Sequence, residues 1–312
     1  MVKRKISRKK FLSAAIAGMT GIKLISQTRY PDPLVAAGSR NLGKTGIMVG
    51  PLCFGAPRTN EESLIRYAID KGIKFIDTGR SYGNGNNEKL VGRAVAGIRK
   101  SIVIQSKIRL DPNELPSGGR GRKGSEEIRN VLSSKLDESL KALDSDYIDI
   151  LLYHDAPGED LLFHDEVMRF YDEMKKKGVI KAHGFSAHND LMNLFERNNR
   201  EPFYDVIMVP FNHKGSFVHS VTGRYSEWDQ NRLLAALTDS GNKGIGVIAM
   251  KTCSGGKYSP SPGNEPNYRE AVRWVVQHPF ISSAAIAMAN FEQVDEFTGI
   301  LREKLIAMHQ QQ

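Results

Sequence analysis

Cysteine is scarce in this sequence, which has 312 residues and two cysteines. Cys53 and Cys253 are too few for a disulfide framework or for a zinc site. Both lie beside predicted strand ends, and neither has a histidine and aspartate neighbourhood that would indicate thiolate chemistry. We therefore interpret both as small buried apolar residues.

Acidic residues are absent from the first 30 positions, which hold eight of the 44 lysines and arginines. The whole chain has a formal net charge of +9, so the remainder of the chain is close to neutral. Positive charge that is confined to one end gives little support to a nucleic acid or an anionic membrane surface as partner. We therefore expect no nucleic-acid partner.

A long apolar run that could span a membrane is also missing, because Lys23 interrupts the modest apolar stretch that begins at Phe11. Basic, apolar and small-residue segments follow one another here as they do in a bacterial export signal. Residues 7–12 resemble the twin-arginine (Tat) motif, except that Lys9 stands where the second arginine is usual. We expect a leader and linker at 1–37, export by the Tat machinery, and a periplasmic folded domain at 38–312. The alternative is a cytoplasmic protein with a disordered basic leader.

Short apolar runs alternate with amphipathic segments from residue 52 to the end of the chain. Strand–helix pairs repeated in this way predict an α/β protein with a closed (β/α)8 TIM barrel. Residues 40–49 alternate around glycines and predict an N-terminal β-hairpin. The predicted strands are 52–55, 73–77, 102–106, 147–152, 180–185, 205–209, 246–250 and 284–287. The predicted helices are 61–71, 88–98, 125–143, 163–177, 190–197, 229–240, 267–277 and 291–305.

A glycine-rich phosphate turn does not follow the first predicted strand, because residues 55–58 are Gly-Ala-Pro-Arg. A doubly wound α/β sheet would carry a GxGxxG turn at that place. The sequence therefore favours the barrel over the doubly wound sheet.

Polar side chains lie where three consecutive predicted strands end. Asp77 ends the second strand, Lys107 follows the third, His154 comes soon after the fourth, and Tyr82 lies five residues beyond Asp77. Because the carboxyl ends of parallel strands meet at one rim of a barrel, we expect these four side chains to form one cluster. A lysine would pair with the buried aspartate and lower the pKa of the tyrosine. The cluster predicts a catalytic site.

Further motifs accompany this cluster along the chain. They are Leu42-Gly43-Lys44-Thr45-Gly46, Phe75-Ile76-Asp77-Thr78 with Tyr82-Gly83 and Glu88, Ser139-Leu140-Lys141-Ala142-Leu143, Asp146-Tyr147-Ile148-Asp149 before His154, Gly184-Phe185-Ser186, Gly246-Val247-Ile248-Ala249-Met250-Lys251, and Phe291-Glu292-Gln293-Val294-Asp295-Glu296. In this order and spacing they resemble the aldo-keto reductase family, over nearly all of residues 40–305.

The resemblance implies an NAD(P)H-dependent oxidoreductase. A hydride would move from the dihydronicotinamide to the carbonyl carbon of an aldehyde, ketone or keto-sugar, or in the reverse direction. Tyr82 would be the general acid or base, with Lys107 easing its proton release and Asp77 holding the lysine. His154 would orient and polarise the substrate oxygen.

The resemblance also implies cofactor contacts, with departures from the family pattern. Ser186 would meet the nicotinamide carboxamide, Met208 stands where glutamine is usual, and Phe211 would replace a tyrosine that stacks on the nicotinamide ring. Ala289 stands where many relatives carry an arginine for the 2′-phosphate, so NADP(H) is only slightly favoured over NAD(H). The other predicted contacts are Lys251, before a pyrophosphate turn at 252–256, and Gln293 and Glu296 at the adenosine end. No metal is expected.

Two other functions remain open. The barrel could bind a nucleotide as a sensor or accessory subunit with little turnover. A metal-dependent hydrolase would need clustered ligands, for which His154, Asp155, His183 and His213 are candidates, but no HxH pair ends the first strand. The substrate itself cannot be read, because the loops at 58–60, 111–124 and 214–228 carry no diagnostic pattern.

Overall fold

The computed structural model describes residues 38–114, 122–188, 190–218, 223–253 and 268–309. The predicted leader at 1–37 lies outside these residues, as do most of the predicted pyrophosphate turn and parts of the loops at 111–124 and 214–228. Within the described ranges, no helix has the length and apolar character needed to cross a membrane.

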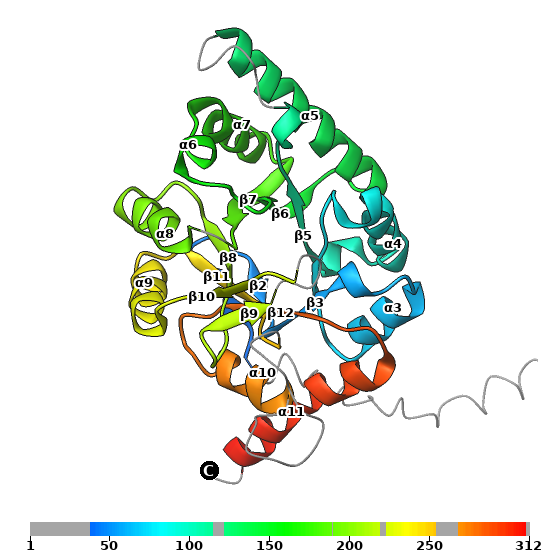
Figure 1. The fold of residues 1–312 in the computed structure, drawn as a ribbon. Helices are drawn as coiled ribbons and strands as arrows, with labels where there is room; N and C mark the ends of the chain where they lie inside the picture. The colour runs from blue at the N-terminus through cyan, green and yellow to red at the C-terminus, as the bar shows by residue number, and fades with distance from the viewer. Residues whose placement is uncertain (1–37, 115–121, 189, 219–222, 254–267, 310–312) are drawn as a thin grey trace, which may run out of the picture. The chain divides into compact units, whose positions relative to one another are not determined.

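Eight parallel strands form a closed barrel with the neighbour order β11-β12-β3-β4-β5-β6-β7-β8 (Figure 1). The pairing of β12 with β3 closes the ring, which confirms the predicted (β/α)8 TIM barrel. The observed strand ends lie within two residues of the predicted ones. The strands are β3 (Leu52–Gly55), β4 (Phe75–Asp77), β5 (Val103–Ile108), β6 (Ile148–Tyr153), β7 (Ile180–Ser186), β8 (Val206–Pro210), β11 (Gly246–Met250) and β12 (Ser283–Ala287).

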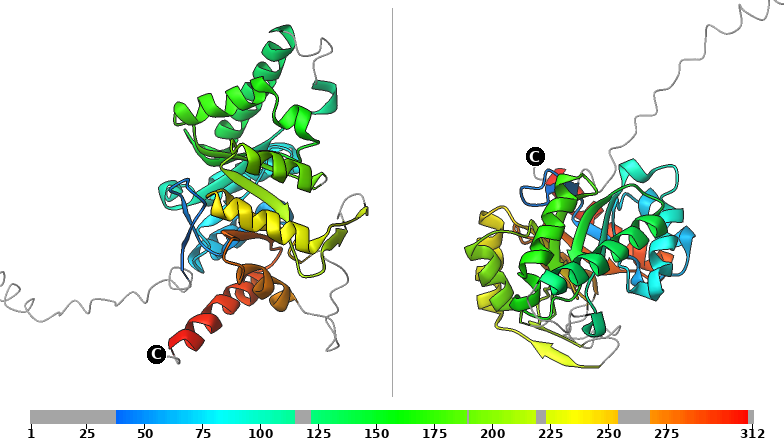
Figure 2. Two further views of the ribbon diagram at one scale, coloured as in Figure 1. Left: turned by 90° about the vertical axis from the view of Figure 1, so that its left-hand side faces the viewer. Right: turned by 90° about the horizontal axis from the view of Figure 1, so that it is seen from above.

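A helix follows each barrel strand and covers the outside of the sheet (Figures 1 and 2). The helices form because apolar residues recur at helical spacing, as in the first of them, which buries Leu64, Ile65, Ala68 and Ile69. They are α3 (Glu62–Asp70), α4 (Asn86–Ala94), α5 (Arg122–Leu143), α7 (Asp165–Lys176), α8 (Leu191–Arg200), α9 (Gln230–Asn242), α10 (Tyr268–Val276) and α11 (Phe291–His309).

The predicted N-terminal hairpin is present as β1 (Arg40–Asn41) and β2 (Met48–Val49). It lies against the amino end of the barrel, where the Lys44 amide donates to the Gly244 carbonyl at 2.7 Å. Gly43 has a φ of +57°, and a Cβ there would come within 2.3 Å of the same carbonyl oxygen, so the turn requires glycine.

A short helix and a second hairpin are among the elements that were not predicted. A short helix α6 (Glu159–Leu162) follows β6, and a second hairpin is formed by β9 (Ser216–Val218) and β10 (Tyr225–Glu227). Figure 2 shows this second hairpin and the N-terminal hairpin at opposite ends of the barrel. The second hairpin therefore lies at the end where the strands have their carboxyl termini, which we call the mouth.

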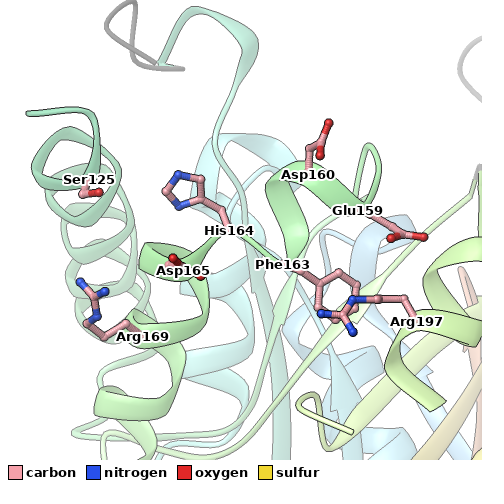
Figure 3. Close-up of a pocket in the computed structure, with 8 residues that line it drawn as sticks. All are labelled: Ser125, Glu159, Asp160, Phe163, His164, Asp165, Arg169 and Arg197. Carbon is pink, nitrogen blue, oxygen red and sulfur yellow. The ribbon is translucent and has the colours of Figure 1, made fainter. Parts of the chain in front are cut away.

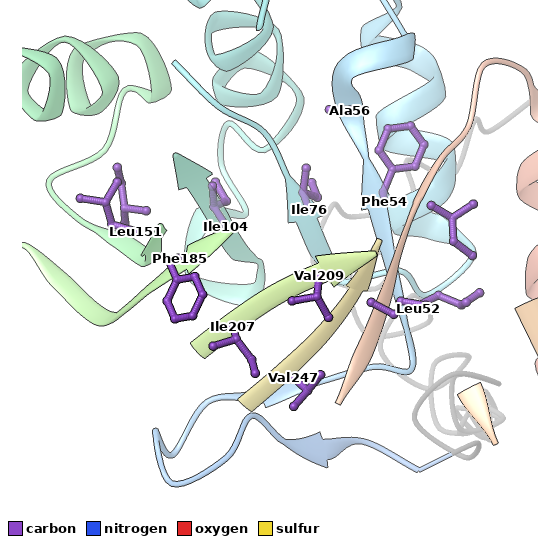
Figure 4. Packing of buried hydrophobic residues seen from close by; sticks show 14 of the residues in the cluster. Leu52, Phe54, Ala56, Ile76, Ile104, Leu151, Phe185, Ile207, Val209 and Val247 are labelled. Carbon is purple, nitrogen blue, oxygen red and sulfur yellow. The ribbon is translucent and has the colours of Figure 1, made fainter. Parts of the chain in front are cut away.

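Side chains alternate along the strands between the barrel interior and the helices. Those that face the helices form the larger apolar cluster, part of which is shown in Figure 4. A separate cluster fills the interior and contains Cys53, Phe75, Met208 and Met250. Because the strand period is two, Asp77, Lys107 and Met208 continue the inward-facing series of their strands, whereas Ile207 and Val209 face outward.

Candidate active site

The structure brings Asp77 and Lys107 together at the mouth. Lys107 is 1% exposed, and its Nζ donates to the Asp77 carboxylate and to the Thr78 carbonyl, the latter at 2.7 Å. Asp77 also accepts a hydrogen bond from Gln105 Nε2 at 2.6 Å. Burial acts to lower the pKa of Lys107, but the negative charge of Asp77 and the interaction with Tyr82 raise it above its usual value. The lysine therefore stays charged.

Tyr82 begins a short 3-10 segment, Tyr82–Gly85, directly beyond β4. Its hydroxyl oxygen accepts a hydrogen bond from Lys107 Nζ at 3.3 Å. Burial raises the pKa of Tyr82, and the Lys107 ammonium offsets only part of that rise. The net direction is opposite to the lowering that we expected from the sequence. Tyr82 is therefore protonated at neutral pH, as a proton donor must be.

The loop that carries Tyr82 is held by an ion pair whose carboxylate is buried. Glu88 is fully buried and accepts from Ser106 Oγ at 2.6 Å, and its other oxygen lies 2.8 Å from the guanidinium of Arg80. Gly85 has a φ of +82°, and a Cβ there would overlap the Arg80 guanidinium. The packing of Arg80 on this glycine therefore helps to fix the loop.

His154 completes the cluster from the residue after β6. Its ring meets the Tyr82 ring edge-on, with 5.4 Å between centroids. Burial, helped by the positive charges of Lys107 and Arg109, lowers the pKa of His154 to about 3. The ring is therefore neutral at physiological pH and carries a proton on one nitrogen only.

Ser81 is a neighbour of His154 that we did not predict. Its Oγ lies 3.1 Å from Nδ1 of the histidine. If the hydroxyl donates to Nδ1, the proton of the neutral ring is at Nε2, and this nitrogen can then donate to a substrate oxygen.

The variant Ser81→Ala should lower kcat/KM for a carbonyl substrate by roughly two- to tenfold, the usual worth of a neutral hydrogen bond. Ser81→Thr retains the hydroxyl and should recover most of the loss. Steady-state rates of the three proteins across pH 5–9 test whether the Ser81 hydroxyl orients His154. If Ser81→Thr loses as much activity as Ser81→Ala, the hydroxyl has no such role and Ser81 acts only by packing.

Two of the predicted cofactor contacts also face the mouth or the interior below it. Ser186 ends β7, and its Oγ accepts from the backbone amide of Asp155 at 2.9 Å. Met208 lies in the interior, with its sulfur 3.3 Å from Gln105 Nε2.

Gln293 and Glu296 lie in the first turns of α11, where Gln293 Oε1 accepts from the Ala289 amide at 2.7 Å. The charges of Glu296 and Arg58 both act on the pKa of Cys253, so the start of α11 lies near the ends of β3 and β11.

Comparison with known proteins places this geometry in a family. The model of the aldo/keto reductase family matches residues 52–272. The chain belongs to this family. Membership of this family, with oxidoreductases among the relatives, makes the chain an NAD(P)H-dependent aldo-keto reductase.

Individual relatives are distant. An uncharacterized oxidoreductase of Bacillus subtilis is 29% identical over 48% of this chain and 47% of its own length, so the match spans about half of that relative. A probable voltage-gated potassium channel subunit beta of Arabidopsis thaliana is 25% identical over 82% of this chain and 89% of its own. An aldo/keto reductase of Klebsiella pneumoniae, solved with NADP and acetate, has a TM-score of 0.60 at 20% identity and covers 84% of this chain and 90% of that one.

The predicted role of Phe211 in this aldo-keto reductase is wrong. Phe211 follows β8 and continues its outward-facing series, so its ring is fully buried on the helix side of the barrel. There it contacts Trp274 at 5.0 Å, His278 at 5.2 Å and Phe280 at 5.9 Å between ring centroids. It cannot stack on a ligand at the mouth unless this packing is broken.

Met250 also faces this site and was not predicted from the sequence. It ends β11 in the interior cluster with Met208, and 8% of its surface is exposed. The alternation of β11 would have identified it, since Ile248 two residues earlier also faces inward. A thioether side chain offers a polarisable apolar surface for a flat ring.

Gln105 was missed for the same reason. It faces inward two residues before Lys107 and is fully buried. Its Nε2 is used by Asp77 and Met208, whereas its Oε1 has no hydrogen-bond partner among the described residues. A buried unpartnered acceptor at this depth is suited to an amide donor from a ligand.

The cysteine and histidine candidates do not form a second chemical site in the described residues. Both cysteines are free, and burial raises the pKa of Cys53 well above its usual value. The ring of His183 stacks on Phe203 with 4.8 Å between centroids, on the helix side of β7. Within the described ranges, no three His, Cys, Asp or Glu side chains are grouped as metal ligands.

A polar cavity of about 330 Å³ lies outside the barrel strands, among α5, α6, α7 and α8 (Figure 3). None of the four clustered side chains lines it. Its walls carry charges of both signs, and Figure 3 shows Arg169 and Arg197 on opposite sides of it. We therefore place the chemistry at the mouth, where titratable groups from several strands converge, and not in this cavity. The lining residues are Ser125, Glu159, Asp160, Phe163, His164, Asp165, Arg169 and Arg197.

Proposed function

We propose that the protein interconverts an aldehyde, ketone or keto-sugar and the corresponding alcohol, with NADP(H) as the nicotinamide cofactor and Tyr82 as general acid or base. The observation that carries the proposal is the position of Lys107 Nζ, which donates both to Asp77 and, at 3.3 Å, to the Tyr82 hydroxyl. A phenol held by a permanent cation is a proton donor whose anion is stabilised when the proton leaves.

Each side chain has a distinct part in the proton transfer. Tyr82 gives its proton to the carbonyl oxygen as the oxygen becomes negative, and Lys107 stabilises the phenolate that remains. Asp77 keeps the lysine charged and in place. Neutral His154 donates to the same oxygen and orients it without competing for the proton, because its pKa is about 3.

The residues around the cluster fit a nicotinamide nucleotide. When bound, it would supply the hydride. Met208 and Met250 offer an apolar floor, while Ser186 Oγ and the unpartnered Gln105 Oε1 offer polar contacts to a carboxamide. Gln293 and Glu296 would hold the adenosine end. NADP rather than NAD is proposed on the similarity to the Klebsiella protein, which was solved with NADP.

A nucleotide-binding accessory subunit is the second candidate function. The similarity to a plant protein named as a potassium channel beta subunit, over 82% of this chain, favours it. The buried lysine and the neutral histidine favour the enzyme instead, because a binding module has no need of a proton donor that is held by a buried cation.

We also propose export to the periplasm by the Tat route, which the sequence of residues 1–37 supports. Free nicotinamide nucleotide should be scarce outside the cytoplasm. An exported enzyme would therefore carry its nucleotide tightly bound and recycle it between two substrates.

One experiment tests both proposals. We expect the full-length protein to be recovered from the periplasmic fraction, to release stoichiometric nucleotide on acid denaturation, and to change nicotinamide absorbance when aldehydes, ketones or keto-sugars are added. Nucleotide binding without turnover on any carbonyl or alcohol would favour the accessory subunit. Recovery in the cytoplasmic fraction would contradict export and leave the enzymatic proposal standing.

A further inference from the structure

Lys251 is the first residue after β11 and has a backbone conformation that is rare for residues other than glycine. Its φ is +57°, which costs about 1–2 kcal/mol for an L-residue. The conformation is fixed by its neighbours, because Asn212 Nδ2 donates to the Lys251 carbonyl at 3.1 Å and the Phe211 amide donates to the Met250 carbonyl at 3.0 Å. The direction of the Lys251 side chain is therefore built into the fold.

This side chain is directed toward the second hairpin. Its Nζ lies 5.5 Å from the centroid of the Phe217 ring on β9. The Phe217 ring is in turn 5.7 Å from the ring of His188, and His188 Nδ1 lies 2.8 Å from Asp155 Oδ1. Asp155 directly follows His154. A continuous series of contacts thus links the ammonium of Lys251 to the side of the mouth that holds His154.

The ammonium has no matching carboxylate among the described residues. The negative charge of Asp155 acts to raise the pKa of Lys251. The Asp155 carboxylate, however, is paired with His188, and it also lies 3.9 Å from the Arg109 guanidinium. Burial lowers the pKa of Lys251, and the positive charge of Arg58 lowers it further. A half-buried cation without a counter-ion is unfavourable, and the face of one phenylalanine ring compensates it only in part.

We propose that Lys251 binds a carboxylate on the carbonyl substrate. The inference rests on the proposed function and narrows its substrate class to carbonyl compounds that carry an acid group. An incoming carboxylate would supply the missing counter-ion, while the carbonyl oxygen lies between Tyr82 and His154. This differs from the expectation that Lys251 is a ligand of the cofactor pyrophosphate.

The first test measures binding, which does not require turnover. Isothermal titration of the NADP⁺-loaded protein compares 4-(hydroxymethyl)benzoate with its neutral amide, 4-(hydroxymethyl)benzamide. We expect the carboxylate to bind more tightly, and Lys251→Met to reduce the ratio of the two affinities by about tenfold or more, as for loss of a charged hydrogen bond. Lys251→Arg should retain part of the preference. The control Lys243→Met removes the same charge from a lysine that pairs with Asp239 at the end of α9, and it should leave the ratio unchanged.

The second test measures kcat/KM for succinic semialdehyde and 4-carboxybenzaldehyde against their neutral amides, so that two carbonyl-to-carboxylate spacings are covered. We expect the preference for the acids to fall in Lys251→Met by a similar factor. The proposal is overturned if the unmodified protein does not prefer the carboxylates, if Lys251→Met weakens acid and amide equally, or if the variant changes only the dissociation constant of NADPH. The last result would assign Lys251 to the cofactor phosphates. Absence of turnover on every aldehyde would instead refute the proposed function, while the titration would still decide the anion site.

Discussion

The variant Tyr82→Phe should reduce carbonyl substrates about 10²–10⁴-fold more slowly than the unmodified protein, the usual contribution of a positioned general acid. The ring still packs edge-on against His154 and over Lys107, so only the hydroxyl that accepts from Lys107 Nζ is lost. The loss should be in kcat, because the phenolic proton is transferred only as negative charge develops on the substrate oxygen.

Two measurements separate this effect from damage to the fold. Nucleotide affinity, followed by fluorescence titration, should change little in Tyr82→Phe. Tyr147→Phe is a matched control, because Tyr147 directly precedes β6, at the end of the barrel opposite the mouth. If Tyr82→Phe retains activity within a fewfold of the unmodified protein, Tyr82 is not the proton donor.

The variant Lys107→Met should lose both activity and stability. It leaves the Asp77 carboxylate buried without its counter-ion, and breaking a buried ion pair in this way typically costs about 3–5 kcal/mol of unfolding free energy. Urea denaturation followed by circular dichroism measures that cost. Activity should fall as well, because the Tyr82 phenolate loses the charge that stabilises it.

The double variant Asp77→Asn with Lys107→Met separates the two roles of the lysine. Removing both charges should restore a large part of the stability, since a neutral amide and a thioether leave no isolated charge in the interior. It should not restore turnover. Recovery of turnover together with stability would show that Lys107 supports the fold and takes no part in the proton transfer.

The architecture was predictable because each barrel strand is short, apolar and followed by an amphipathic helix. Strand boundaries shifted by at most two residues, for example at Phe75, where β4 begins later than expected, whereas some helix ends shifted by up to four. The second hairpin was missed because its strands have three residues each, too few to show an alternating pattern. Its position over the mouth depends on contacts with other parts of the chain, such as that between Phe217 and His188.

The cluster of Asp77, Lys107 and His154 was predictable from strand ends alone. The carboxyl ends of parallel strands share one rim of the barrel. Because side chains alternate between the two faces of a strand, Asp77 and Lys107 both point inward. The same rule would have identified Met250 from the alternation of β11 and excluded Phe211 from the alternation of β8. The place of Phe211 in the family pattern does not show which face of the strand its ring occupies.

The sequence by itself determined the barrel and the set of polar side chains that meet at its mouth, because both follow from local periodicity and from the common direction of parallel strands. Only the tertiary structure decided three further properties. Burial raises the pKa of Tyr82 in spite of the nearby Lys107 ammonium, and burial also keeps His154 neutral. The left-handed backbone conformation of Lys251 directs its own side chain over the Phe217 ring. These depend on how much water each group loses and on contacts between residues far apart in the chain, which no local pattern encodes.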